Sequence, residues 1–242
     1  MTDNILICSI FRNREHHIER WFSQIKKIVN TFVDFNFSIS VYENDSTDST
    51  REKLINIFNS SDMDMFDSKR LQYEELQTNY FGSIKDEQRV KNLANARNKC
   101  LNADSLDLAK FTKILFIEPD FSYSLEDSIK ILNADSVHQT KFDIISGLSF
   151  FRGNFYDSWA TRKTDLDLES FVSHKESIEN FWSTFNGFCL YNAKPFIEGI
   201  RFQWFNKRLK IYDCDTAVIC EEFREKGYNN IVIDCSARFE HQ

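Results

Sequence analysis

The sequence is poor in glycine and proline and has no excess of positive charge. Its 242 residues include six glycines and two prolines, and neither GxGxxG nor GxxxxGK occurs, so a glycine-lined phosphate loop is not expected. The 37 acids outnumber the 30 bases and give a net charge of −7. Because nucleic-acid binding depends on positive charge, we expect no nucleic-acid partner.

Long apolar runs and paired cysteines are also missing. No segment approaches the roughly 20 apolar residues that cross a bilayer, and the first residues, MTDNILICSIF, lack the basic region of a signal peptide. The six cysteines form no CxxC pair and are expected to be reduced thiols. These features predict a cytoplasmic protein without a transmembrane segment, and they leave peripheral contact with a membrane open.

The chain does contain an alternation of strand-length apolar runs with segments of helical period. Hydrophobic residues make up 42% of it, enough for a sizeable core. ILICSIF (5–11) and FSISVYEN (37–44) have the length of buried strands, and apolar residues at helical spacing follow each of them. Ser49 and Glu52 have capping-box spacing at the second helix. The pattern continues with a helix at about 86–102, a strand at 114–117 and a helix at about 125–133.

The stretch from about 60 to 85 and the second half of the chain are less regular. Strands are expected at 142–151, 187–193 and 230–239. The segment DSWATRKTDLDLESF (157–171) has no clean period and is predicted to form loops and a lid.

The alternation of strands and helices predicts the α/β class with a mainly parallel central sheet. Because no repeat or flexible linker marks a boundary, we expect one domain over residues 1–242. Its front, about 1–133, is Rossmann-like, and its rear, about 134–242, is mixed. In such sheets the ligand binds outside the carboxyl ends of the strands.

An acidic pair ends one predicted strand, in KILFIEPDFSYS (113–124). If the chain stays extended, Glu118 and Asp120 point to the same side, roughly 6.5 to 7 Å apart. Pro119 would stiffen the pair. Carboxylates on one side can share Mg²⁺ or Mn²⁺. The alternative is an ordinary acidic turn.

A second polar strand end lies in YENDSTDST, where Glu43 and Asn44 can accept hydrogen bonds from a base or ribose. Helix capping is the alternative role of the residues that follow, and of these we expect at least one to cap. In the third helix Arg97 falls on the apolar face and needs an acceptor, either a carboxylate or a phosphate. Asp215 begins a later helix, and Gly227 stands at its stop.

Taken in order, these segments resemble glycosyltransferases of the GT-A fold. VYENDSTDST resembles the nucleotide-binding strand end of that superfamily, NLANARNKCL its arginine-bearing helix, and FIEPD its acidic metal motif. The last helix, strand and His241 are similar to the acceptor-side helix and closing histidine. FYDSWATRKTD, NGFCLYNAKPF and GIRF resemble the fungal capsule-associated α-1,3-mannosyltransferases in particular. Those proteins carry a membrane anchor and a different acidic motif.

The resemblance implies a metal-dependent transfer of a hexose, with mannose favoured, from a nucleotide sugar to a glycan or glycolipid. GDP-mannose is the favoured donor, a UDP-sugar the alternative, and Mn²⁺ or Mg²⁺ the cofactor. For Trp159, a sugar platform and a core aromatic are equal alternatives, and for Asp157 a structural hydrogen bond is favoured. The implied residues are, for catalysis, Asp120, Asp215 and Asp157; for the nucleotide, Ser9, Arg12, Glu43, Asn44 and Arg97; for the metal, Glu118, Asp120 and His241; and for the sugars, Trp159 and Arg162.

The resemblance also implies retention at the anomeric carbon. An inverting enzyme would need a carboxylate base, for which Asp215 or Glu221 could serve. A non-catalytic nucleotide- or carbohydrate-binding module on the same fold is the competing class. A metal-dependent phosphohydrolase would need more acids or histidines around Asp120 than the sequence offers.

Overall fold

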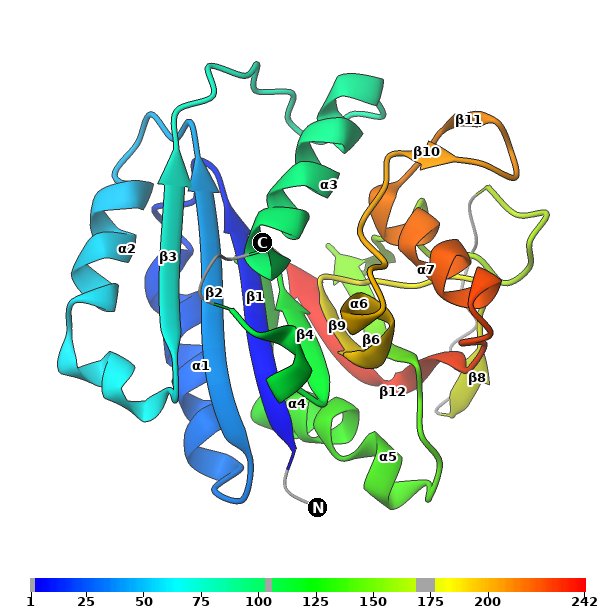
Figure 1. Ribbon diagram of the computed structural model, residues 1–242, viewed down its shortest axis with the longest axis horizontal. Helices are drawn as coiled ribbons and strands as arrows, with labels where there is room; N and C mark the ends of the chain where they lie inside the picture. The colour runs from blue at the N-terminus through cyan, green and yellow to red at the C-terminus, as the bar shows by residue number, and fades with distance from the viewer. Residues whose placement is uncertain (1–2, 103–105, 169–176) are drawn as a thin grey trace.

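A ten-stranded sheet forms the centre of the computed structural model, which describes residues 3–102, 106–168 and 177–242 (Figure 1). The strands run in the order β3-β2-β1-β4-β9-β6-β12-β5, with β7 beside β6 and β8 beside β12, and β10 and β11 form a separate hairpin. The strands are β1 (Asn4–Phe11), β2 (Asn36–Asn44), β3 (Lys69–Glu74), β4 (Lys113–Ile117), β5 (Phe121–Tyr123), β6 (Ile144–Phe151), β7 (Asn154–Phe155), β8 (Ile178–Asn180), β9 (Phe188–Asn192), β10 (Phe205–Asn206), β11 (Ile211–Tyr212) and β12 (Ile231–His241).

The sheet is mainly parallel, which confirms the predicted α/β class. β3, β2, β1 and β4 are parallel to one another, and β6 is parallel to β12. β9 runs antiparallel between β4 and β6 and joins the two halves. Figure 1 shows the parallel half in blue to green on the left and β12 in red on the right. The carboxyl ends of β1, β2 and β4 therefore lie at the same edge.

Helices cover both faces of the sheet because the side chains of its strands alternate between two cores. In β1, Ile5 and Ile7 belong to one core, while Leu6 and Cys8 belong to the other. The first core includes residues of α1 (Ile18–Thr31), α2 (Thr50–Phe58), α4 (Leu125–Leu132) and α5 (Ala134–Val137), and the second includes residues of α3 (Glu87–Leu101), α6 (Lys194–Ile197) and α7 (Asp215–Glu225). Two 3₁₀ turns, η1 (Ser61–Met65) and η2 (Leu108–Lys110), complete the elements.

Two local expectations at α2 and β3 need correction. Ser49 is the N-cap of α2 but its side chain makes no capping bond, so the capping box with Glu52 does not form. Asp48 accepts the Thr50 amide instead. The stretch from about 60 to 85, expected to be irregular, contains β3. Its sequence is mostly polar and has no apolar run that would have predicted an edge strand.

The end of α7 follows the expectation. Gly227 has a φ of +88°, and its amide and that of Tyr228 bond to the carbonyls of Arg224 and Phe223. This is a Schellman motif, in which glycine avoids the strain of a left-handed residue.

The predicted loop region at 157–171 has little regular structure where it is described. An isolated bridge joins Arg162 to Ser183. Residues 169–171 lie outside the described residues, and the lid stays a prediction. No helix in the described part of the chain is long and apolar enough to cross a membrane.

Candidate active site

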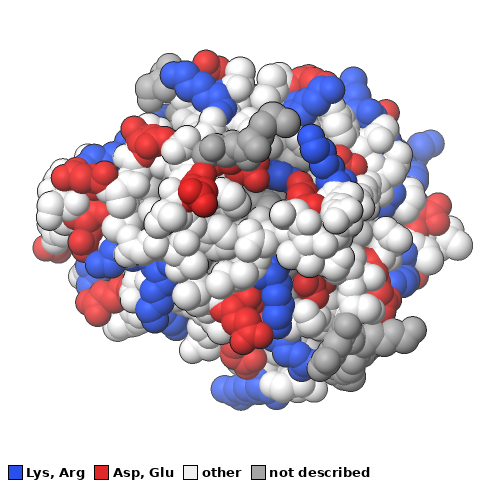
Figure 2. Space-filling model, turned by 90° about the horizontal axis from the view of Figure 1, so that it is seen from below, with Lys and Arg blue, Asp and Glu red and all other residues white. Residues whose placement is uncertain are grey.

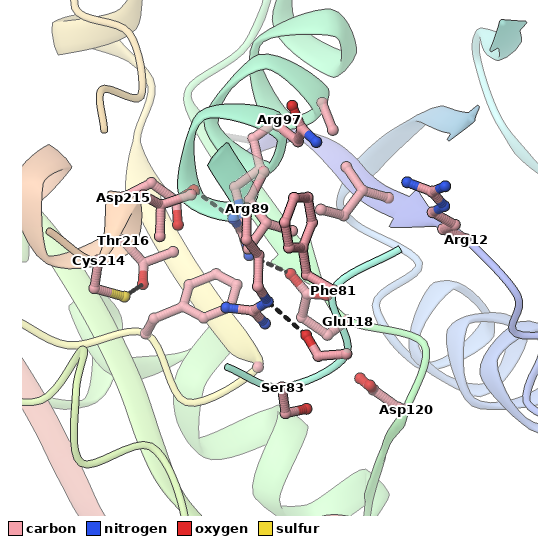
Figure 3. A pocket seen from close by; sticks show the side chains of 18 of the residues that line it. Arg12, Phe81, Ser83, Arg89, Arg97, Glu118, Asp120, Cys214, Asp215 and Thr216 are labelled. Atoms are coloured by element: carbon pink, nitrogen blue, oxygen red, sulfur yellow. Dashed lines mark hydrogen bonds and ion pairs between the residues drawn. The ribbon is translucent and has the colours of Figure 1, made fainter. Parts of the chain in front are cut away.

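A cavity of about 400 Å³ opens at the carboxyl ends of β1, β2 and β4 (Figure 3). Its walls come from the loop after β1, residues 79–85, the inner face of α3 as far as Arg97, the start of α7, the turn after β4 and His241 at the end of β12. Ligands of open α/β sheets bind in this position. The fold therefore brings together segments that are up to about 230 residues apart in the chain.

The acidic pair belongs to a turn at the rim of this cavity. β4 ends at Ile117, and the Phe121 amide donates to the Glu118 carbonyl, so the extended geometry expected for Glu118 and Asp120 is wrong. Both residues nevertheless line the cavity.

Glycine at 187 holds the acidic turn in place. Gly187 has a φ of +72° and its carbonyl accepts the Glu118 amide at 2.8 Å. A Cβ at this position would meet the Phe121 ring at 2.3 Å. Only glycine allows so close an approach of backbone and ring.

Arg97 is buried on the inner face of α3, as its place in the helical stripe predicts. It is 4% exposed, and its Nη2 donates to Glu118 Oε1 at 2.6 Å while its Nη1 pairs with Asp215. Figure 3 shows this bridge across the pocket. Burial raises the pKa of Glu118 and of Asp215 against the opposing charge of Arg97. Of the two acceptors considered for Arg97, the structure thus supplies carboxylates.

Asp120 faces two basic groups. Its Oδ2 lies 3.2 Å from Arg14 Nη2 and 3.5 Å from His241 Nε2. Burial favours the neutral acid, but the His241 ring and the Arg14 guanidinium hold the pKa of Asp120 below its usual range. Asp120 is therefore an anion at neutral pH.

His241 is positioned by aromatic rings. It stacks on Tyr156 with centroids 4.1 Å apart, and it forms T-shaped contacts with the rings of Phe121 and Phe151. Its Nδ1 is buried and has no hydrogen-bond partner within the described residues. The ring can therefore present Nε2 to Asp120 with little freedom to turn.

Asp157 and Trp159 both line the cavity. Asp157 Oδ2 accepts the Asn186 amide at 2.7 Å, the structural hydrogen bond favoured for it. Burial raises the pKa of Asp157 to about 6, although the Asn186 amide favours its ionised form. Trp159 is half-buried, with Lys85 Nζ 5.4 Å from its ring centroid.

Three residues assigned from the sequence lie outside the cavity lining, so the structure does not bring their side chains into the site. Ser9 Oγ donates to the Ile117 carbonyl and accepts from the Trp21 indole. Glu43 is fully buried and binds Arg51. Arg162 is also fully buried, and its guanidinium forms two hydrogen bonds with Asp213, at 2.8 and 2.5 Å.

Arg12 and Asn44 do line the cavity, and they also organise its rim. Arg12 donates to the Thr78 hydroxyl at 2.9 Å and to the Asn79 carbonyl at 3.0 Å. Asn44 donates to Asp45, which accepts the amides of residues 76–78. Both therefore fix the start of the 79–85 segment.

Several lining residues were missed from the sequence, among them Arg14, Arg89, Tyr156 and Thr216. Arg89 lies two turns before Arg97 on α3, a spacing that helical periodicity could have marked. Arg14 lies in a loop, and Tyr156 depends on its stacking with His241, so no local signal pointed to either.

The donor set suits a divalent ion that arrives with a phosphate ligand. Asp120 and His241 supply two converging donor atoms, and Glu118 is engaged by Arg97. No cluster of three or more His, Cys, Asp or Glu side chains suited to a metal occurs among residues 3–102, 106–168 and 177–242. Mg²⁺ and Mn²⁺ sites often use one or two protein ligands, with phosphate and water completing the shell.

Solved structures share the fold at low sequence identity. S. aureus TarS 1–349 matches with a TM-score of 0.56 and 14% identity over 100% of this chain and 60% of that one. The structure of TarS 1–349 in complex with UDP-GlcNAc matches with a TM-score of 0.54 and 16% identity, over 99% of this chain and 58% of that one. The mannosyltransferase PcManGT from Pyrobaculum calidifontis, in complex with GDP-Man and Mn²⁺, matches with a TM-score of 0.60 and 12% identity. The match covers 100% of this chain and 57% of that one. The chain thus spans less than two thirds of these proteins.

These neighbours are glycosyltransferases of the GT-A fold, as the sequence resemblance predicted. No match was found among curated proteins. A family model described as Cryptococcal mannosyltransferase 1 matches residues 4–222, which include β1, α3, the acidic turn and the start of α7. The chain belongs to the Cryptococcal mannosyltransferase 1 family.

Proposed function

We propose that this protein transfers a hexose, mannose in the first place, from a nucleoside diphosphate sugar to a glycan or glycolipid. The observation that carries the proposal is the meeting of Asp120, His241 and several arginines in one cavity at the strand ends, in a chain of a mannosyltransferase family. The neighbours crystallised with GDP-Man and with UDP-GlcNAc support a nucleotide sugar as the donor. GDP-mannose is therefore the first candidate and a UDP-sugar the second.

Each group in the cavity has a defined part in this reaction. Asp120 and His241 would hold a Mn²⁺ or Mg²⁺ ion, which supplies charge neutralisation for the leaving diphosphate. Arg97 keeps Glu118 and Asp215 in position by binding both. Trp159 offers an apolar ring face to a sugar at the cavity wall.

The arrangement of the acids supports retention. Asp215, one of the two candidates for an inverting base, is engaged by Arg97. Glu221, the other, lies outside the cavity lining and binds Asn206 and Arg208. In the retaining route the leaving phosphate itself can assist the incoming hydroxyl, so no further base is required. The anomeric configuration of the product, measured by NMR, would contradict this if it were inverted.

A panel of nucleotide sugars tests the proposal. The purified protein is incubated with Mn²⁺ and each donor, with GDP-mannose first, and hydrolysis or transfer is followed by release of the nucleoside diphosphate. Asp120→Asn should abolish turnover, because it removes the anion that faces His241. Asp64→Asn is the matched control, since its carboxylate is exposed on η1 and should leave the rate unchanged.

The competing function is a binding module without chemistry. That module would bind a nucleoside diphosphate in calorimetry but release none from any donor of the panel. Failure to bind any nucleoside diphosphate, with or without Mn²⁺, would refute both the transferase and a nucleotide-binding module, and only a carbohydrate-binding module would then stand.

A further inference from the structure

Positive charge gathers in the pocket of an otherwise acidic chain. Five Lys and Arg side chains and four Asp and Glu side chains line it, whereas the whole chain carries −7. On the face shown in Figure 2, Lys and Arg lie next to Asp and Glu, and outside the grey residues no broad area has one sign. The local balance of charge favours an anion in the cavity.

Arg89 is a pocket cation that forms no ion pair with the described residues, although its charge acts on Asp215 from a longer distance. It stands in the first turn of α3, and its Nε donates to the Gly82 carbonyl at 2.7 Å. Within the described part of the chain, no carboxylate lies within ion-pair distance of its guanidinium, and its two Nη groups donate to no protein group. Figure 3 shows Arg89 among the pocket residues near Ser83 and Phe81. Its terminal nitrogens are therefore available to a ligand.

Arg14 reaches the pocket from a different element, the loop after β1. Its Nη2 lies 3.2 Å from Asp120 Oδ2, and its Nη1 donates to the Asn13 carbonyl at 3.1 Å and to the Tyr80 hydroxyl at 3.4 Å. Its side chain is 29% exposed, so the ion pair is in reach of water and ligand. The pair is partly exposed on the Arg14 side, and a phosphate oxygen can replace the carboxylate as the acceptor.

We propose that Arg14 and Arg89 form a subsite that binds the diphosphate of the donor without a metal ion. The inference rests on the proposed function, because a nucleoside diphosphate is the anion that a nucleotide-sugar enzyme must hold. Guanidinium groups match phosphate oxygens with two parallel hydrogen bonds, and two arginines from separate elements can hold a diphosphate between them. When Arg14 binds phosphate, Asp120 loses its guanidinium partner and becomes a better metal ligand.

Calorimetry in EDTA tests the subsite, with pyrophosphate, GDP and UDP as probes. The wild-type protein should bind all three without metal. Arg89→Gln should weaken each by about tenfold or more, because a charge-assisted hydrogen bond is lost. Lys91→Gln is the matched control. Lys91 lies on the same helix and pairs with Glu87 outside the cavity lining, so the variant should bind the three probes as the wild type does.

Arg14→Gln should change the binding of phosphate probes and the binding of Mn²⁺ in opposite directions. It should weaken the three probes in EDTA, and it should strengthen the binding of Mn²⁺ alone, because Asp120 loses a neighbouring cation. A merely misfolded variant would lose both kinds of binding, and thermal unfolding confirms that each variant is folded.

The outcomes separate this inference from the proposed function. If GDP or UDP binds the wild type only with Mn²⁺, or if Arg89→Gln stays within twofold of the wild type in EDTA, the arginine subsite is refuted and nucleotide-sugar transfer stands. If no probe binds with or without Mn²⁺, both are refuted.

Discussion

Removing Arg97 should destabilise the fold strongly, and by an amount that depends on pH. Its guanidinium is 4% exposed and binds both Glu118 and Asp215. Breaking a buried ion pair by removing one partner costs about 3 to 5 kcal/mol. Since a typical domain unfolds with about 5 to 15 kcal/mol, Arg97→Met should lose a large part of its stability. Urea unfolding at pH 7, followed by circular dichroism, measures the loss.

The pH dependence has a defined sign. Without Arg97, the folded-state pKa values of both carboxyls rise further above their unfolded values, because burial already raises them. The folded variant then binds more protons than the unfolded chain, so its stability falls as pH rises through this window. The deficit of Arg97→Met should be smaller at pH 5 than at pH 7.

A control and a rescue make the reasoning refutable. Arg70→Met removes a half-buried arginine of β3 that donates to Gln72 and the Lys99 carbonyl, and it should cost less than about 1 kcal/mol. Adding Glu118→Gln and Asp215→Asn to Arg97→Met should recover about 2 kcal/mol, because no buried charge remains unpaired. A deficit below about 1 kcal/mol for Arg97→Met, or an equal deficit at both pH values, would overturn this account.

Two further substitutions test neighbouring parts of the site. The raised pKa of about 6 means that Asp157 holds its proton in the folded state between about pH 4 and 6, so it makes stability fall by about 2 to 3 kcal/mol over that range. Asp157→Asn should remove this slope from urea unfolding curves, and an unchanged slope would contradict the burial argument. Arg162→Met should cost about 3 to 5 kcal/mol by leaving Asp213 without its guanidinium. Its GDP affinity, measured in the cold where it stays folded, should remain within twofold of wild type, and a larger change would return Arg162 to the sugar site.

Local signals in the sequence account for the architecture. Apolar runs such as residues 5–11 and 37–44 predicted β1 and β2, because strand and helix periods depend on neighbouring residues alone. The inward direction of Arg97 also followed from helical spacing. The run at 187–193 predicted β9 as well, but its antiparallel pairing with β4, like the pairing of β5 with β12, joins distant segments and could not be predicted from neighbouring residues.

The sequence by itself determined that the chain is an α/β protein with acids and an arginine near its strand ends. Only the tertiary structure decided which polar groups face the cavity and what each one binds. Ser9 and Glu43 stand near the same strand ends as Arg12 and Asn44, yet their side chains are buried in hydrogen bonds with Trp21 and Arg51. The Arg14–Asp120 and Arg97–Asp215 pairs join residues that are more than 100 positions apart. The physical reason is that a charge acts through space, so its partner is set by the packing of strands and helices and not by the residues beside it.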